Sequence, residues 1–378
     1  MIRMKNSITI ICKPTHNCNM NCEYCYDKQE KALIKNEKIP MNILEQAIKI
    51  SLKSFKNIIW IWHGGEATLM GKDFFIKANE IFNKYKTDEH NIEFLTQSNG
   101  KNSKETREWL EELNIKPGYS YDVLNENKYR KEEYDIIKNL KEDDGMISVV
   151  SEPNTDLIEP FKKYQKRGVT FNKIFFNNGT YDVDGYVNSF KKLFNYMLWN
   201  KNIDNLERNL FGYIQVICNS KDVYCNMKQC LGNMVSINPD GTIMICDTFG
   251  IKDKKYHLGN VMDYKELKEC FSSNGFINVV KDDFEFRKNY CEKCEVNMFC
   301  KNICKNSRYN LNKERDLSQQ NKQECEFRIK LLNYIFETLF NLSRNDLLNI
   351  NEKIYNLLME NKFIFKFIID ELEEDKYV

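Results

Sequence analysis

The sequence predicts an α/β fold, a partial (β/α)6 TIM-like barrel followed by a small cysteine-rich domain and C-terminal helices. The first observation is a regular alternation of short apolar strands and amphipathic helices from residue 6 to about residue 200. The second is the distribution of cysteine, because ten of the fourteen cysteines lie between Cys218 and Cys325. Consecutive strand-helix units imply a parallel sheet, whose functional site lies at the carboxyl ends of the strands.

Six segments have the length and apolar content of strands, at residues 7–12, 57–62, 92–96, 117–121, 146–150 and 171–176. Helical periodicity is found at residues 42–55, 73–85, 103–113, 131–141, 156–166 and 185–200. The alternation stops near residue 205. We therefore expect a barrel over residues 1–205, a cysteine-rich domain over 206–330 and a helical tail over 331–378.

One clear hairpin is expected in the cysteine-rich part, with strands at 234–237 and 242–245 on either side of the turn sequence Asn-Pro-Asp-Gly. In the tail, apolar residues recur at helical spacing over 327–342 and 345–374. We expect these helices to pack back onto the protein's own surface. A dimer or partner contact is the alternative.

The charge balance of the chain limits its partners. Lysine plus arginine (56) and aspartate plus glutamate (55) nearly cancel, which argues against nucleic acid and anionic membranes as partners. No apolar run is long enough to span a membrane, and the apolar stretch at residues 8–11 is too short for a signal peptide. We therefore expect a cytoplasmic protein. Thiols stay reduced in the cytoplasm, so the cysteines predict metal or redox chemistry rather than disulfides.

The first group of cysteines, Cys18, Cys22 and Cys25, follows a predicted strand with the spacing Cys-x3-Cys-x2-Cys. Three thiolates can hold three irons of a [4Fe-4S] cluster and leave the fourth iron open for chemistry. A structural zinc ion is the alternative, and it needs a fourth ligand such as His16 or Cys12.

This cysteine loop resembles the signature of the radical S-adenosylmethionine (SAM) superfamily. The resemblance implies that Cys18, Cys22 and Cys25 hold the cluster and that SAM chelates the open iron. It also implies that a 5′-deoxyadenosyl radical abstracts a hydrogen atom from the substrate. Tyr24 then lies against the adenine, and simple loop packing is the alternative for this ring.

The segment after the second predicted strand, Trp-His-Gly-Gly-Glu at residues 62–66, resembles the glycine-rich motif that binds the SAM amino group. Gly64 and Gly65 permit a close backbone approach, and Glu66 offers a carboxylate to an ammonium. The superfamily usually has proline where Ala67 stands. His63 is a candidate contact of SAM or substrate, or else a histidine satisfied within the barrel mouth.

Two further segments follow predicted strands and match SAM-binding positions of the superfamily. Asn99 lies in a segment that resembles the Thr-Asn-Gly turn. The resemblance implies that Ser120 and Arg130 hold the SAM carboxylate, for which a guanidinium is well suited. A solvent-exposed arginine is the alternative for Arg130.

The C-terminal cysteines resemble the SPASM extension of radical SAM enzymes, which holds two auxiliary [4Fe-4S] clusters and brings the expected total to three. By this resemblance the first auxiliary cluster is held by Cys225, Cys230, Cys246 and Cys304. The second is held by Cys291, Cys294, Cys300 and Cys325. Open alternatives are a pair of structural zinc sites, Cys218 in place of Cys225, and a first auxiliary cluster with an open iron.

The resemblance to sulfatase and peptide maturases favours a peptide or protein substrate and a reducing partner such as ferredoxin or flavodoxin. We expect oxidative modification of a ribosomally made peptide by a thioether or carbon-carbon crosslink, with Asp247 as the base. Asp247 is alternatively a hydrogen-bond acceptor that supports a ligand. The other candidate functions are formylglycine formation by an anaerobic sulfatase maturase, a small-molecule radical SAM dehydrogenase and a zinc-stabilised binding module.

Overall fold

The structure is a computed structural model. It describes residues 6–22, 25, 27, 38–101, 104–124, 141, 144–173, 182–220, 231–247, 254–300 and 317–361. The predicted helix at 131–141 has only residue 141 in these ranges. Five predicted site residues lie outside the described residues: Tyr24, Arg130, Cys225, Cys230 and Cys304.

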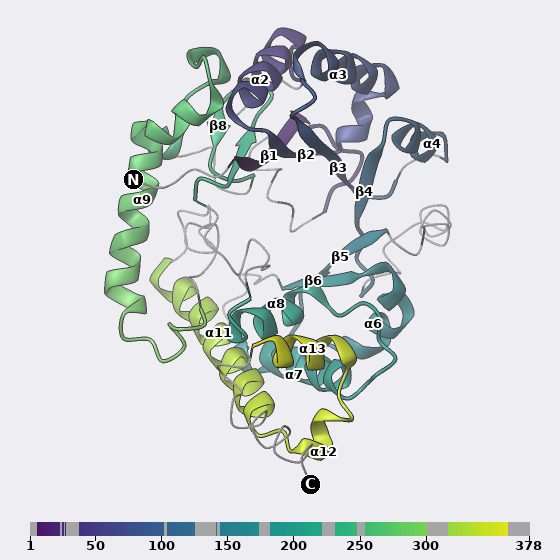
Figure 1. Cartoon of the computed structure of the whole chain (residues 1–378), viewed down its shortest axis with the longest axis vertical. Coiled ribbons are helices and arrows are strands. Elements are labelled where there is room, and N and C mark those ends of the chain that lie inside the picture. Colours follow the sequence, from purple (N-terminus) through teal and green to yellow (C-terminus); the bar gives the residue numbers. More distant parts are fainter. Residues whose placement is uncertain are drawn as a thin grey trace.

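One sheet runs through the described residues in the order β6-β5-β4-β3-β2-β1-β7-β8 (Figure 1). Its strands are β1 (Ser7–Thr15), β2 (Asn57–Gly64), β3 (Asn91–Ser98), β4 (Ile115–Ser120), β5 (Gly145–Val150), β6 (Val169–Lys173), β7 (Met234–Ile237) and β8 (Ile243–Met244). Strands β1 to β6 pair in parallel with their sequence neighbours. The six predicted strands and the partial barrel are confirmed.

The helices of the barrel cover the outer face of this curved sheet (Figure 1). Helices α2, α3 and α4 lie outside β1 to β4, and α6, α7 and α8 lie beside β5 and β6. Their bounds are α2 (Met41–Ser54), α3 (Lys72–Tyr85), α4 (Lys104–Glu112), α6 (Ile158–Tyr164), α7 (Val183–Leu198) and α8 (Arg208–Ile217).

Strand β2 shows how the sequence separates the two faces of the sheet. Trp60 and Trp62 are buried beneath the helices, where the Trp60 ring lies 5.0 Å from Phe82. Ile59 points the other way and is 38% exposed. Because successive side chains of a strand point to opposite faces, His63 lies on the same inner face as Ile59.

The predicted hairpin is confirmed, although its second strand spans only Ile243–Met244. Gly241, with a φ of +85°, makes the turn. Strand β7 also pairs in parallel with β1, from Thr9 with Met234 to Cys12 with Ile237. The hairpin therefore extends the barrel sheet beyond β1 and brings the chain that follows it, including Cys246, next to the barrel.

The C-terminal helices are α9 (Asn274–Phe286), α11 (Leu317–Phe340), α12 (Arg344–Leu347) and α13 (Glu352–Glu360). Helix α11 packs along α7 and contacts α8 (Figure 1). Phe327, Leu331 and Ile335 of α11 are buried in the same core as Phe190 and Phe194 of α7. The described part of the tail thus packs onto the protein's own surface, as expected. The domain boundaries at 205 and 330 remain predictions.

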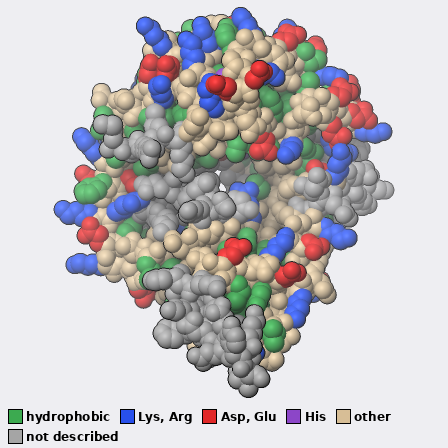
Figure 2. Space-filling view, viewed as in Figure 1, with side chains coloured by type: hydrophobic (Ala, Val, Ile, Leu, Met, Phe, Trp, Pro, Cys, Tyr) green, Lys and Arg blue, Asp and Glu red, His purple; other side chains and the backbone are tan. Residues whose placement is uncertain are grey.

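The surface agrees with the balanced composition. In Figure 2 the charged side chains of both signs are interspersed among the described residues of this face. No described helix is long and apolar enough to cross a membrane.

Candidate active site

The cysteine loop begins where β1 ends, at the carboxyl end of the parallel strands. Cys18 is exposed, Cys22 and Cys25 are half-buried, and none of the three forms a disulfide. The Asn99 side-chain amide donates to Cys18 Sγ at 3.6 Å and to Asn19 Oδ1 at 2.7 Å. The turn after β3 therefore touches the loop. Three thiols on one loop are a donor set that fits an iron-sulfur cluster.

The glycine-rich turn after β2 lies directly against the segment that leads to Cys18. The amide of Gly65 donates to Thr15 O at 2.9 Å, and the amide of Glu66 donates to Asn17 O at 2.8 Å. A Cβ on Gly64, whose φ is +108°, would lie 2.3 Å from Thr15 O. A Cβ on Gly65 would lie 2.3 Å from Asn17 O. Both positions therefore need glycine for this close approach.

Gly65→Ala is expected to displace the cysteine loop, because the clash is with backbone atoms that cannot rotate away. We expect loss of most iron from the first cysteine site and at least about a tenfold weaker SAM affinity. Iron analysis and equilibrium dialysis with SAM would measure these effects. Gly145→Ala is the matched control, since nothing lies within 4 Å of its Cβ. Equal iron and SAM binding in both variants would contradict the role of the close contact.

Glu66 is fully buried, and hydrogen bonds occupy both carboxylate oxygens. Oε1 accepts from the Thr68 hydroxyl at 2.6 Å and the Thr68 amide at 3.3 Å. Oε2 accepts from the Asn99 amide at 2.8 Å and the Ser98 hydroxyl at 3.2 Å. Glu66 thus ties the turn after β2 to the turn after β3. Protein groups therefore occupy four acceptor positions of the Glu66 carboxylate. The contact between Glu66 and the SAM ammonium remains a prediction.

Ser120 lies at the end of β4, next to the end of β3. Its hydroxyl accepts a hydrogen bond from Gln97 Nε2 at 2.8 Å. The structure thus brings Gly64, Gly65, Glu66, Asn99 and Ser120 to the same end of the sheet as the cysteine loop, at the ends of β2, β3 and β4. Their assignment to SAM remains a prediction.

A buried ionic network beneath the cysteine loop was missed by the sequence analysis. Lys13 is 1% exposed, and its Nζ lies 2.7 Å from the main-chain oxygen of Asp247 and 3.5 Å from Asp27 Oδ1. His16 Nδ1 lies 2.9 Å from the same Asp27 oxygen. Burial raises the pKa of Asp27, but the hydrogen bond with His16 and the charge of Lys13 outweigh burial and lower it. Asp27 is therefore ionised, and Lys13 links the cysteine loop to Asp247.

Asp247 contacts Cys246 through its side chain and Lys13 of β1 through its main-chain oxygen. Cys246 Sγ is 3.1 Å from Asp247 Oδ1. Burial lowers the pKa of His63, and the charge of Asp247 opposes this shift, so the two side chains are electrostatically coupled. His63 Nδ1 accepts from the Gly64 amide at 2.8 Å, so the neutral ring carries its proton on Nε2. The structure therefore places a carboxylate near a hydrogen-bond donor on the inner face of the barrel.

Four predicted ligands of the second auxiliary cluster surround one small cavity: Cys291, Cys294, Cys300 and Cys325. Among the described residues, no three His, Cys, Asp or Glu side chains are close enough to hold a single metal ion. In a [4Fe-4S] cluster each thiolate binds a different iron, so the sulfurs surround a volume instead of meeting at a point. The donor set fits such a cluster.

Three other cysteines are buried in apolar cores: Cys12, Cys218 and Cys270. Burial raises the pKa of the Cys218 and Cys270 thiols to about 12 and that of Cys12 still further. Burial has the same effect on the predicted ligand Cys325, so a raised thiol pKa does not separate ligands from other cysteines, and Cys218 stays an alternative to Cys225. Of the first auxiliary set, the described residues include Cys246.

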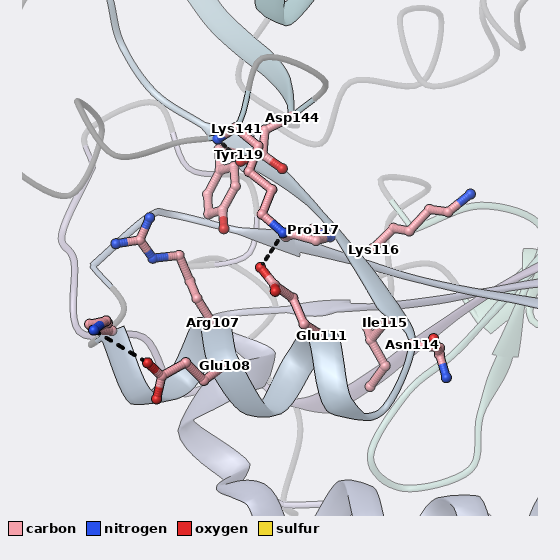
Figure 3. A pocket seen from close by; sticks show the side chains of 11 residues that line it. Arg107, Glu108, Glu111, Asn114, Ile115, Lys116, Pro117, Tyr119, Lys141 and Asp144 are labelled. Carbon is pink, nitrogen blue, oxygen red and sulfur yellow. Dashed lines mark hydrogen bonds and ion pairs between the residues drawn. The ribbon is translucent and has the colours of Figure 1, made fainter.

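A larger cavity lies elsewhere, between α4 and β4 (Figure 3). Two ion pairs lie among its lining residues, Lys141 with Glu111 at 2.7 Å and Lys104 with Glu108 at 3.6 Å. Tyr119 lines it, whereas the next residue, Ser120, points to the other face of the sheet. The cavity is therefore separate from the site at the strand ends.

Comparisons with known proteins agree with this arrangement. Residues 225–295 match the SPASM family model, described as an iron-sulfur cluster-binding domain. The cysteine-type anaerobic sulfatase-maturating enzyme of Clostridium perfringens is 24% identical over 374 residues, covering 89% of this chain and 99% of that enzyme. The radical SAM cyclopropyl synthase TigE of Paramaledivibacter caminithermalis is also 24% identical, covering 88% of this chain and 75% of TigE.

This chain is similar to radical SAM maturases over most of its length. The structure of anSMEcpe with bound AdoMet has the same fold, with a TM-score of 0.71 and 22% identity over 90% of this chain and 99% of that one. SuiB of Streptococcus suis, bound to its precursor peptide SuiA, matches with a TM-score of 0.54 and 15% identity, covering 79% of this chain and 72% of SuiB. The SPASM match thus gives residues 225–295 a similarity to iron-sulfur cluster-binding domains, and the relatives that match most of the chain are named as a sulfatase-maturating enzyme and a radical SAM synthase.

Proposed function

We propose that this enzyme oxidatively modifies a ribosomally made peptide and forms a thioether or carbon-carbon crosslink. The position of Asp247 carries the proposal, because its carboxylate lies beside Cys246 and is coupled to His63. Oxidation of a peptide side chain releases a proton as well as electrons. A carboxylate at the inner face of the barrel is suited to accept that proton.

The cofactor assignments form part of the proposal. Bound SAM supplies a 5′-deoxyadenosyl radical. The catalytic cluster is assigned to Cys18, Cys22 and Cys25. The SAM site is assigned to Tyr24, Gly64, Gly65, Glu66, Asn99, Ser120 and Arg130. The auxiliary clusters are assigned to Cys225, Cys230, Cys246 and Cys304, and to Cys291, Cys294, Cys300 and Cys325.

The proposed partners follow from the chemistry. The substrate is a peptide or protein, which agrees with the precursor peptide bound to SuiB. The catalytic cluster needs an electron from outside, so the proposal includes a reducing protein such as ferredoxin or flavodoxin. Both partners, and the oxygen-sensitive clusters, fit a cytoplasmic enzyme.

Formylglycine formation is the second candidate function. The observation that favours it is that cysteine-type sulfatase-maturating enzymes of C. perfringens and C. novyi match 89% and 88% of this chain, each at 24% identity. Asp247 has the same proton-accepting role in both functions. The two reactions differ in the fate of the substrate sulfur.

Mass spectrometry of peptide products separates the two candidates. Anaerobic enzyme with SAM and dithionite is incubated with a small peptide encoded beside its gene, or with a sulfatase-derived peptide that contains cysteine. A crosslink removes two hydrogen atoms and keeps the sulfur. Formylglycine formed from cysteine replaces sulfur by oxygen. Failure to modify either peptide, while SAM is still cleaved, would count against both functions and favour a small-molecule substrate.

A further inference from the structure

A charged side chain lines the cavity that the four cysteines of the second auxiliary set surround. Arg328 lies on α11, one turn after Cys325, and is 6% exposed. The other described residues that line the cavity are the uncharged Tyr290, Val296, Asn297 and Ile329, besides the four cysteines. Among these lining residues, Arg328 alone brings a full positive charge to the thiols.

Glu324 lies one turn before Arg328 on α11, and Lys173 contacts both of its carboxylate oxygens at 2.7 Å. Lys173 also lies over the Phe327 ring, 4.5 Å from its centroid. Arg328 lines the same cavity as all four cysteines and is one turn from Cys325 on the same helix, so its positive charge acts on the sulfurs. Arg328 is therefore electrostatically coupled to the thiol set.

We propose that Arg328 raises the reduction potential of the cluster held by Cys291, Cys294, Cys300 and Cys325. The inference rests on the proposed function, which assigns a [4Fe-4S] cluster to these cysteines. Four thiolates make such a cluster anionic, and reduction adds one more negative charge. A buried guanidinium stabilises the reduced form more than the oxidised form, and low solvent exposure strengthens the effect.

The consequence concerns electron flow. A peptide oxidation that begins with hydrogen abstraction leaves one electron to be removed from the substrate radical. A raised potential makes the second auxiliary cluster a better acceptor for that electron. In this proposal Arg328 touches neither substrate nor SAM. It acts on the cluster through its charge, so it is a positioning residue and not a catalytic residue.

Redox titration monitored by electron paramagnetic resonance tests the proposal. The background is the Cys18, Cys22 and Cys25 to alanine variant, which removes the catalytic cluster's signal. At the wild-type midpoint of the second auxiliary cluster, Arg328→Gln is expected to lower the ratio of reduced to oxidised cluster about tenfold, about 59 mV for a one-electron couple. Arg328→Lys, which keeps the charge, is expected to retain most of the potential.

Lys330→Gln is the matched control. Lys330 lies two residues away on α11 and pairs with Asp184 at 2.7 Å and Glu326 at 2.6 Å, and it does not line the cavity. An unshifted potential in Arg328→Gln, or an equal shift in Lys330→Gln, would overturn the proposal. If Arg328→Gln loses the cluster's iron, retention in Arg328→Lys supports the proposal and loss in both overturns it. The redox titration needs no substrate. The potential of the cluster can therefore be interpreted even if the proposed peptide reaction is wrong.

Discussion

Replacing Cys18, Cys22 and Cys25 together by alanine is expected to abolish SAM cleavage and to lower iron from about twelve to about eight atoms per chain. The three thiols lie on one loop, which follows β1. Removal of all three leaves SAM with no open iron to bind. Iron and acid-labile sulfide on anaerobically reconstituted protein, with 5′-deoxyadenosine assayed under dithionite, measure both effects.

Cys12→Ala is the control for this variant. Cys12 lies on β1 close to the loop, but it is fully buried and its thiol pKa is raised. It is expected to lose some stability, about 1 kcal/mol, and to retain iron and SAM cleavage. About four irons in the wild type would remove the auxiliary clusters from the proposal. Zinc without iron would contradict the radical chemistry altogether.

The barrel and its site loops could be predicted because local sequence determines them. The apolar alternation of β2 places Trp60 and Trp62 under the helices and His63 on the inner face. Residues of the turns after β2, β3 and β4 then meet because carboxyl ends of parallel strands share one edge of a sheet. The resemblance likewise assigned all four cysteines of the second auxiliary set, including Cys325, to one cluster, and the four side chains line one cavity.

The pairing of β7 with β1 could not be predicted, because it joins segments more than two hundred residues apart and leaves no periodic pattern. Lys13 was missed for a related reason. A lysine at the end of a strand usually reaches solvent, but its partner Asp247 lies 234 residues away and is brought near only by that pairing. Asp27 was missed because its partner Lys13 precedes the cysteine loop and Asp27 follows it.

Asp247→Asn is expected to lower the rate of peptide modification by about 10²- to 10⁴-fold while 5′-deoxyadenosine is still formed. Asparagine keeps the shape of the side chain but cannot accept a proton. The Lys13 contact uses the main-chain oxygen of Asp247, so the substitution leaves this anchor in place. Product and 5′-deoxyadenosine are quantified in the same reaction, and their ratio reports the uncoupling.

Asp240→Asn is the matched control, because it removes a carboxylate from the same hairpin, where Asp240 accepts from the Thr242 amide at 2.9 Å. It is expected to leave the ratio of product to 5′-deoxyadenosine unchanged. A parallel fall of both products in Asp247→Asn would instead indicate that Asp247 supports assembly of the site. Unchanged product would exclude the proton-accepting role. Because Asp247 adjoins the proposed cluster ligand Cys246, a loss of activity alone could come from lost proton transfer or from a damaged cluster. The ratio of product to 5′-deoxyadenosine separates these two causes.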